Sequence, residues 1–415
     1  MTFSSLRLLL SSAVFVLALS ASHAAGRDGH WVPTWVSAQQ LTEPGNMPPA
    51  PGLAERSLRQ IIQPTLAGTR LRVVISNQYG EKPLVLAGAR IARSTGASGI
   101  DPSTDRAVTF NGRAGVTVLP GTSMMSDDVM FAVEAFENLA VSLHVLEVPE
   151  QLTGHPGSRT TSFIQSGDAL AQKSWPDAQQ TDHWYLLASV EVLADREAAA
   201  IVVLGDSITD GRGSTTNQND RWPNLLARRL HANPATAKIS VLNQGAGGGR
   251  ILRDGLGDSA LKRFDRDVLA QPGVRWLVIF EGVNDLGTAV GARTKGLPAA
   301  SADDLIAAFR QMILRAHRHG IRVIGATIMP FAGFTSYDTP ESEADRQKVN
   351  AWIRDSGEFD GVIDFDAITR DPAQPARLSA AVDGGDHLHP SAAGYRIMAD
   401  AIDLSLFSSA KAKAR

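Results

Sequence analysis

The residues that could carry out nucleophilic chemistry stand in four short segments of the chain. The first is Gly205-Asp206-Ser207, which follows directly after the apolar run 200–204. A serine in this place lies at the carboxyl edge of a sheet, where its hydroxyl is exposed to a ligand. Taken alone, Gly-Asp-Ser is more typical of a turn that begins a helix. It also lacks the second glycine of the G-x-S-x-G nucleophile elbow.

Two further segments offer groups that could bind a negatively charged oxygen. Residues 243–250 read Asn-Gln-Gly-Ala-Gly-Gly-Gly-Arg, and glycines allow backbone amides to approach a ligand closely. The segment lacks the Gly-Lys-Ser/Thr of a Walker A loop, and a dinucleotide fingerprint is expected after the first strand instead. Asn284, within residues 281–285, is a neutral donor suited to developing negative charge. On its own, an asparagine here is more typical of a turn.

The fourth segment pairs a carboxylate with a histidine near the C-terminus. Asp386 and His389 are three residues apart, so one tight turn can aim the carboxylate at a ring nitrogen. Such a pair fixes the tautomer of the imidazole and stabilises its protonated form. His387 and His389 could instead hold a metal ion or lie in a solvated turn, but no third ligand accompanies them at the usual spacing. We therefore expect no metal at this pair.

The composition limits the chemistry further. The 415 residues include no cysteine, which excludes thiol nucleophiles, disulfides and thiolate metal sites. Forty Lys and Arg against 43 Asp and Glu give a formal charge of −3, so nothing electrostatic favours a nucleic acid or an anionic membrane as partner. With 43% hydrophobic and 20% charged residues, wholesale disorder and a coiled coil are excluded. The nucleophile must be oxygen or nitrogen.

The elements that position these segments follow two different patterns. Residues 31–195 contain short strand-like runs separated by Gly, Pro, Asn and Asp, which predicts an all-β sandwich or jelly-roll-like domain. Residues 198–409 alternate apolar strands with helical periods, which predicts an α/β domain with a doubly wound (flavodoxin-like), mostly parallel five-stranded sheet. In the first part, strands are expected at 70–77, 83–90, 115–119, 129–133 and 139–147. In the second, strands are expected at 200–204, 239–242, 276–280, 321–327 and 361–364, and helices at 222–230, 302–319, 341–354 and 392–407, with Asp220 capping the first helix.

The first 24 residues have the pattern of a signal peptide. Arg7 precedes an apolar run at 8–19, and Ser22-His23-Ala24 offers small residues at the cleavage-determining positions. The run is too short to span the roughly 30 Å of a bilayer core. An uncleaved N-terminal anchor is the alternative. We expect an exported protein, periplasmic or secreted after cleavage near Ala24, with no stable membrane insertion.

Together and in this order, the four segments resemble the SGNH (GDSL-type) hydrolase family over residues 198–407. The family is named for a Ser, a Gly, an Asn and a His in four sequence blocks. These correspond here to Ser207, Gly248, Asn284 and His389. The segment reads Gly-Asp-Ser-Ile rather than Gly-Asp-Ser-Leu, and the glycine run 247–249 leaves the glycine assignment open by one position. The sequences of residues 203–226 and 281–285 look like those of the extracellular arylesterase/acylhydrolase-like branch of this family.

The resemblance implies a serine esterase that works through a covalent acyl-enzyme without a cofactor. Ser207 would be the nucleophile, and His389, oriented by Asp386, the general base. The amides of Ser207 and Gly248 and the side chain of Asn284 would form the oxyanion hole. Some members of the branch act in xylan degradation and carry a β-rich N-terminal region, so the expected substrate is a small-molecule or polysaccharide ester, with acetyl esters of carbohydrate first.

Four questions stay open at this point. A lipase or lysophospholipase is the alternative within enzymes, although the candidate lids, 287–300 and 331–340, lack a sustained apolar stripe. A catalytically dead carbohydrate-binding protein is the alternative outside enzymes. The N-terminal domain could bind substrate or act as a scaffold beside the site, and aromatic residues such as Trp35 and Trp184 are more typical of core than of a sugar platform. The oligomeric state is not predicted.

Overall fold

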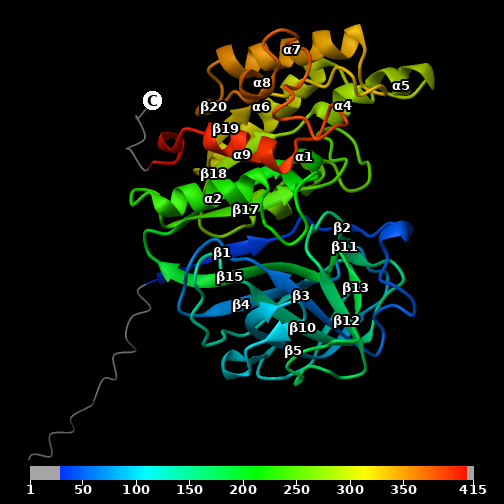
Figure 1. Ribbon diagram of the computed structural model, residues 1–415, viewed down its shortest axis with the longest axis vertical. Coiled ribbons are helices and arrows are strands. Elements are labelled where there is room, and N and C mark those ends of the chain that lie inside the picture. The colour runs from blue at the N-terminus through cyan, green and yellow to red at the C-terminus, as the bar shows by residue number, and fades with distance from the viewer. Residues whose placement is uncertain (1–28, 409–415) are drawn as a thin grey trace, which may run out of the picture.

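The computed structural model describes residues 29–408, which form a β-rich region followed by an α/β region (Figure 1). In the β-rich region, one sheet has the strand order β1-β15-β4-β9 and another β13-β12-β3-β10-β5-β6, with β7 and β8 pairing β5. Both sheets contribute to one large hydrophobic core, which continues into the α/β region. The strands are β1 (Gly29–Val36), β2 (Gln40–Leu41), β3 (Arg56–Ile62), β4 (Leu71–Ser76), β5 (Leu84–Gly96), β6 (Gly99–Ile100), β7 (Arg106–Val108), β8 (Val116–Val118), β9 (Ser123–Met125), β10 (Leu139–Glu147), β11 (Thr153–His155), β12 (Ser162–Ser166), β13 (Gln179–Thr181), β14 (Trp184–Tyr185) and β15 (Leu187–Asp195).

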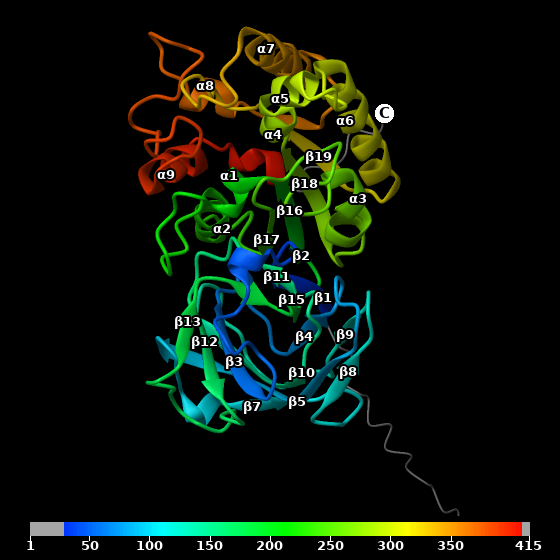
Figure 2. The ribbon, with the colours of Figure 1, turned by 90° about the vertical axis from the view of Figure 1, so that its right-hand side faces the viewer.

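The α/β region is built on a parallel five-stranded sheet of order β17-β16-β18-β19-β20. Helices α2 and α9 cover one face and α3 and α6 the other (Figure 2), so the predicted doubly wound fold class is confirmed. The strands are β16 (Ala199–Gly205), β17 (Ile239–Gly245), β18 (Val274–Phe280), β19 (Arg322–Ala326) and β20 (Gly361–Ile363). The helices are α1 (Ser207–Asp210), α2 (Trp222–Ala232), α3 (Ala260–Phe264), α4 (Val283–Gly287), α5 (Ala289–Thr294), α6 (Ala302–Arg318), α7 (Pro340–Asp355), α8 (Phe365–Thr369) and α9 (Ala392–Asp400).

The central strand β16 explains why the site-bearing sheet forms. All seven of its residues are buried, as expected for a strand that is paired on both sides and covered by helices on both faces. Because parallel strands end at the same edge, β16, β17 and β18 bring the first three sequence segments together.

The edge strand β17 is covered by the β-rich region. Strand β1 lies beside it, and Thr65 Oγ1 accepts a hydrogen bond from the Val241 N–H (3.1 Å) and lies 2.9 Å from Ser240 Oγ. A side chain of one region thus satisfies an edge amide of the other, which would otherwise be open to pairing. The two regions therefore share a close, hydrogen-bonded interface.

Three local predictions were wrong. Residues 129–133 form isolated bridges, Leu71 with Val129 and Gly68 with Val133, rather than a strand. Asp220 does not cap α2; its carboxylate accepts from the Thr215 N–H (2.9 Å) in the preceding loop, and Arg221 occupies the cap position. The last helix ends at residue 400, because Asp403 caps a separate 3₁₀ turn at 404–407.

Within residues 29–408, no helix is both long enough and apolar enough to cross a membrane. The expected signal peptide at residues 1–24 lies outside the described residues.

Candidate active site

The turn between β16 and α1 presents Ser207. A side chain at Gly205 would place its Cβ 2.1 Å from Thr209 Oγ1, so only glycine lets the chain turn this tightly. The Asp206 carboxylate then caps α1 by accepting from the Ile208 N–H (2.9 Å). Ser207 is consequently the first residue of α1, at the carboxyl edge of the sheet, with its backbone N–H at the positive end of the helical turn.

Ser207, His389 and Asp386 form a continuous hydrogen-bonded chain. Ser207 Oγ lies 2.8 Å from His389 Nε2, and His389 Nδ1 lies 2.7 Å from Asp386 Oδ2. The other carboxylate oxygen, Oδ1, accepts from the backbone N–H groups of His389 (2.8 Å) and Leu388 (3.0 Å). Asp386 is thus fixed at both oxygens, which holds the imidazole with Nε2 toward the serine.

The surroundings favour the neutral form of His389. Burial, the largest influence, lowers the pKa of His389; the hydrogen bond and charge of Asp386 raise it, and the positive charges of Arg212 and Arg159 lower it, leaving the pKa below its usual value. For Asp386, burial acts to raise the pKa, but the hydrogen bonds from His389 outweigh burial and the pKa lies below its usual value. A neutral ring beside an ionised carboxylate is ready to accept the serine proton.

Backbone amides near Ser207 offer an oxyanion site. Gly248 has a φ of +67°, and its N–H donates to no partner among the residues that the structure describes. The neighbouring Gly249 N–H is already used, because it donates to the Ala246 carbonyl (2.9 Å). Of the glycines left open by the sequence, Gly249 is therefore the least suitable donor, and the geometry is consistent with Gly248.

The amide of Asn284 is oriented by two partners. Its Nδ2 donates to the Gly249 carbonyl (2.8 Å), and its Oδ1 accepts from the Tyr337 hydroxyl (2.8 Å). Nδ2 carries a second hydrogen that this arrangement leaves for a ligand. Tyr337 was not identified from the sequence, where it lay in a candidate lid.

Asp285 connects the segment 281–285 by hydrogen bonds to the two residues that follow the glycine-rich segment 243–250. Its carboxylate accepts from the backbone N–H groups of Ile251 (2.8 Å) and Leu252 (3.1 Å). These residues directly follow the glycine run, so Asp285 fixes the loop that carries Gly248. Burial raises the pKa of Asp285 to about 6, against the lowering effect of the two amides. The role of Asp285 was not predicted from the sequence, although the segment 281–285 was a candidate for binding a negatively charged oxygen.

His387 and His389 contact the carboxylates of different aspartates. His387 Nδ1 lies 2.6 Å from Asp383 Oδ2, whereas His389 pairs with Asp386. No group of three or more His, Asp or Glu within the described chain is placed to hold a metal ion. The residues at the site therefore offer a proton relay and hydrogen-bond donors.

Comparison with known proteins identifies the second half of the chain. Residues 203–397 match the GDSL-like Lipase/Acylhydrolase family. A search of curated proteins found no match.

Solved structures of similar fold share little sequence with this chain. A GDSL-like lipase from Bacteroides thetaiotaomicron VPI-5482 is 20% identical, covering 50% of this chain and 87% of that one, with a TM-score of 0.37. A lipase/acylhydrolase from Enterococcus faecalis is 23% identical, covering 49% and 92%, with a TM-score of 0.38. A catalytic mutant of an acetylxylan esterase from Geobacillus stearothermophilus is 21% identical, covering 52% and 97%, with a TM-score of 0.39.

The family match agrees with the resemblance to SGNH (GDSL-type) hydrolases inferred from the four segments, and that prediction is confirmed. Residues 203–397 form a GDSL-like lipase/acylhydrolase domain, and the protein is a carboxylic ester hydrolase.

Proposed function

We propose that the protein is an exported serine esterase that removes short acyl groups, acetyl above all, from carbohydrate esters through a covalent acyl-enzyme. The observation that carries the catalytic part is the chain from Ser207 Oγ to His389 Nε2 (2.8 Å) and from His389 Nδ1 to Asp386 Oδ2 (2.7 Å). A hydroxyl, an imidazole and a carboxylate in this geometry have the three roles of a catalytic triad.

The reaction proceeds in two acyl transfers. Ser207 Oγ attacks the ester carbonyl carbon while its proton passes to His389 Nε2, and Asp386 stabilises the imidazolium. The Ser207 and Gly248 N–H groups and Asn284 Nδ2 bind the oxyanion of the tetrahedral intermediate. His389 then returns the proton to the leaving alcohol, which leaves the acyl group on Ser207. Water, activated by His389, attacks this ester and releases the acid.

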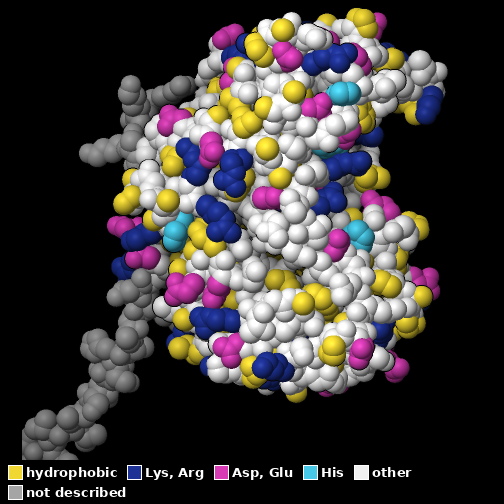
Figure 3. Space-filling view, viewed as in Figure 1, with side chains coloured by type: hydrophobic (Ala, Val, Ile, Leu, Met, Phe, Trp, Pro, Cys, Tyr) yellow, Lys and Arg dark blue, Asp and Glu magenta, His cyan; other side chains and the backbone are white. Residues whose placement is uncertain are grey.

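The preference for short acyl groups is supported by the aromatic side chains of the candidate lid 331–340, which pack against one another rather than forming an exposed apolar surface. In the candidate lid 331–340, Phe331 is buried, and Phe334 packs edge-on against Tyr337 with ring centroids 4.9 Å apart. Interfacial lipases commonly expose an extended apolar surface or move an apolar lid. On the face in Figure 3, apolar side chains form small groups among charged ones.

The catalytic part is tested by substitution of the nucleophile. Ser207→Ala and His389→Ala are each expected to lower the turnover of p-nitrophenyl acetate by about 10⁴–10⁶-fold, and the double variant little further, because triad members act as a unit. A fluorophosphonate probe should label the parent at Ser207. Turnover of Ser207→Ala within tenfold of the parent would refute the assignment, and an unlabelled, inactive parent would indicate a binding protein.

The substrate is tested by acyl chain length. The kcat/KM for p-nitrophenyl esters should fall from acetyl to decanoyl, and acetate should be released from acetylated xylan. A rise with chain length, and a jump above the critical micelle concentration, would establish a lipase instead.

Export is tested on the N-terminus. The proposal predicts a mature chain that begins near Ala25, as determined by N-terminal sequencing of the exported protein. Met1 on exported material would refute cleavage.

A further inference from the structure

The turn that carries Ser207 is held at both ends by polar groups connected to the β-rich region. At the beginning of the turn, the Gly205 carbonyl accepts from Arg263 Nη2 (3.0 Å). At its end, the Asp210 carboxylate oxygen Oδ1 lies 2.9 Å from Nε2 of His155, a residue of β11. The three side chains in these contacts, those of His155, Asp210 and Arg263, are all buried.

The first connection runs through His155. Its Nδ1 lies 2.8 Å from the Ala38 carbonyl, and its Nε2 faces Asp210. The ring also stacks on Trp184, with centroids 5.7 Å apart and an interplanar angle of 24°. His155 thus has an oxygen acceptor opposite each ring nitrogen and an aromatic ring on one face, so the position of Asp210 depends on the β-rich region.

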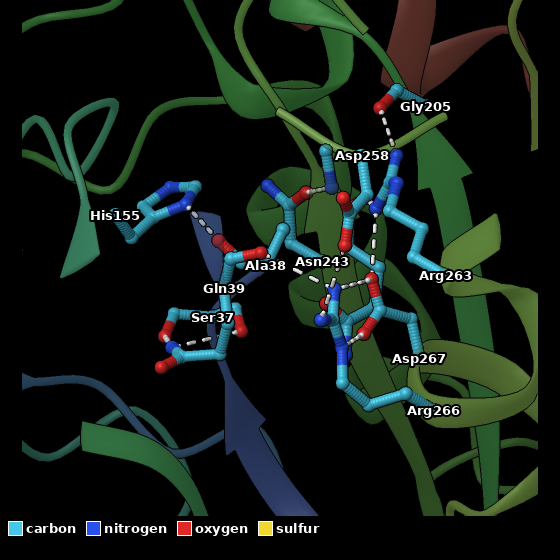
Figure 4. Close-up of polar contacts among 12 residues, drawn as sticks. Ser37, Ala38, Gln39, His155, Gly205, Asn243, Asp258, Arg263, Arg266 and Asp267 are labelled. Carbon is cyan, nitrogen blue, oxygen red and sulfur yellow. Dashed lines mark hydrogen bonds and ion pairs between the residues drawn. The ribbon is translucent and has the colours of Figure 1, made fainter. Parts of the chain in front are cut away.

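The second connection runs through a chain of charged side chains. Arg263 pairs with Asp267 (3.1 Å), and Asp267 accepts from Arg266 Nε (2.6 Å). Arg266 Nη2 in turn donates to the Gln39 carbonyl (3.2 Å), and its Nη1 contacts the Tyr79 hydroxyl (3.2 Å). Figure 4 shows this chain from Gln39 through Arg266 and Asp267 to Arg263 and Gly205.

Both connections begin at adjacent residues of one anchored segment, 37–39. Ser37 N–H donates to the Ala188 carbonyl (3.0 Å), and Gln39 Nε2 donates to Ser37 Oγ (2.7 Å) and to the Leu187 carbonyl (3.1 Å). This fastens the segment to β15, and Figure 4 shows Ala38 bonded to His155 on one side and Gln39 facing Arg266 on the other.

We propose that the segment 37–39 positions the nucleophile turn through these two polar connections, with His155 and Arg266 as positioning residues for ester hydrolysis. The proposal rests on Ser207 as nucleophile, the function proposed above. A displacement of the turn would lengthen the 2.8 Å contact between Ser207 Oγ and His389, and a misplacement of about 1 Å at a reacting group costs about 10²-fold in rate. The β-rich region then contributes to ester hydrolysis by positioning the nucleophile turn, and this role does not depend on any contact between the region and the substrate.

The test compares two replacements of His155 in the full-length protein. His155→Gln places a side-chain amide near the position of Nε2 and so retains the contact with Asp210. His155→Asn places its amide near the position of Nδ1 only, and so it loses the contact with Asp210. His155→Asn should lower kcat for p-nitrophenyl acetate by about 10–100-fold with KM within twofold, and it should slow inactivation by a fluorophosphonate equally. His155→Gln should recover most of the loss. Arg266→Gln should also lower kcat several-fold, and Arg266→Lys less.

Thr65→Val is the matched control, because Thr65 is a buried contact between the same two regions but touches β17 rather than the nucleophile turn. It should lower the melting temperature while leaving kcat unchanged. If His155→Asn does not fold, His155→Asn/Asp210→Asn replaces it, because that variant leaves no unpaired buried carboxylate. The proposal would be overturned if the kcat of His155→Asn lay within twofold of that of Thr65→Val. It would also be overturned if His155→Asn and His155→Gln lost kcat equally. In either case an active, Ser207-labelled parent leaves the proposed function intact.

Discussion

Removal of one hydroxyl, in Tyr337→Phe, tests how the oxyanion site is held in place. The Tyr337 hydroxyl donates to Asn284 Oδ1 (2.8 Å), and within residues 29–408 the other partner of this side-chain amide is the Gly249 carbonyl, which accepts from Nδ2 (2.8 Å). The Tyr337 ring packs against Phe331 and Phe334, and phenylalanine preserves this packing. The substitution therefore removes one hydrogen bond and little else.

The expected effect lies between two limits. Deletion of the donor itself, in Asn284→Ala, should lower kcat by about 10²–10³-fold, the scale for one oxyanion-hole donor. Loss of a single neutral hydrogen bond is worth about 0.5–1.5 kcal/mol, which corresponds to about 2–12-fold in rate. Because Gly249 still holds the amide, we expect Tyr337→Phe to lower kcat by this smaller factor, with KM nearly unchanged.

A double-mutant cycle separates this role from a general effect on folding. kcat for p-nitrophenyl acetate and the melting temperature are measured for the parent, both single variants and the double variant. If Tyr337 acts through Asn284, its substitution should have no further effect on kcat in the Asn284→Ala background. An equal loss of kcat in both backgrounds would refute the reasoning.

Two further predictions follow from the electrostatics and loop contacts of the site. Because the pKa of His389 lies below its usual value and the ring must be neutral to accept a proton, kcat/KM should persist into weakly acidic solution and fall only below the usual histidine pKa. Arg212→Gln removes a positive charge that disfavours the protonated ring, so the pKa should rise and the acidic limb of the kcat/KM profile should move to higher pH; an unchanged limb would contradict this. Asp285→Ala removes the acceptor of the Ile251 and Leu252 N–H groups and should lower both kcat and the melting temperature, since unsatisfied buried donors cost about 1–3 kcal/mol each. A parent-like kcat would show that the loop holds its shape without Asp285.

The part of the site predicted from the sequence is the part that strand ends define. An apolar run such as 200–204 marks a buried strand, and parallel strands place their carboxyl ends at one edge. The residues that follow three such runs, among them Ser207 and Asn284, were therefore expected to meet. Asp386 and His389 were predictable as a pair because only one turn separates them.

The supporting contacts could not be predicted in this way, because they join positions far apart in the chain. His155 lies 55 residues from Asp210, and Tyr337 lies 53 residues from Asn284. No periodicity relates such residues, and each has an ordinary alternative as a core or loop side chain. The error at Asp220 has a similar origin: an aspartate before a helix suits a cap, but the carboxylate bonds to Thr215 in the preceding loop instead.

The position of the β-rich region beside β17 gives it two physical roles at once. Thr65 satisfies a backbone amide of this edge strand, so the region protects the sheet from pairing with other chains. Because β17 neighbours β16 directly, the same interface lies one strand from the nucleophile turn. The segment 37–39 and His155 can reach both ends of that turn for this reason. Support of the sheet and alignment of Ser207 are therefore consequences of a single docking geometry, and they can be separated experimentally only by substitutions such as Thr65→Val and His155→Asn, which affect different contacts of the same interface.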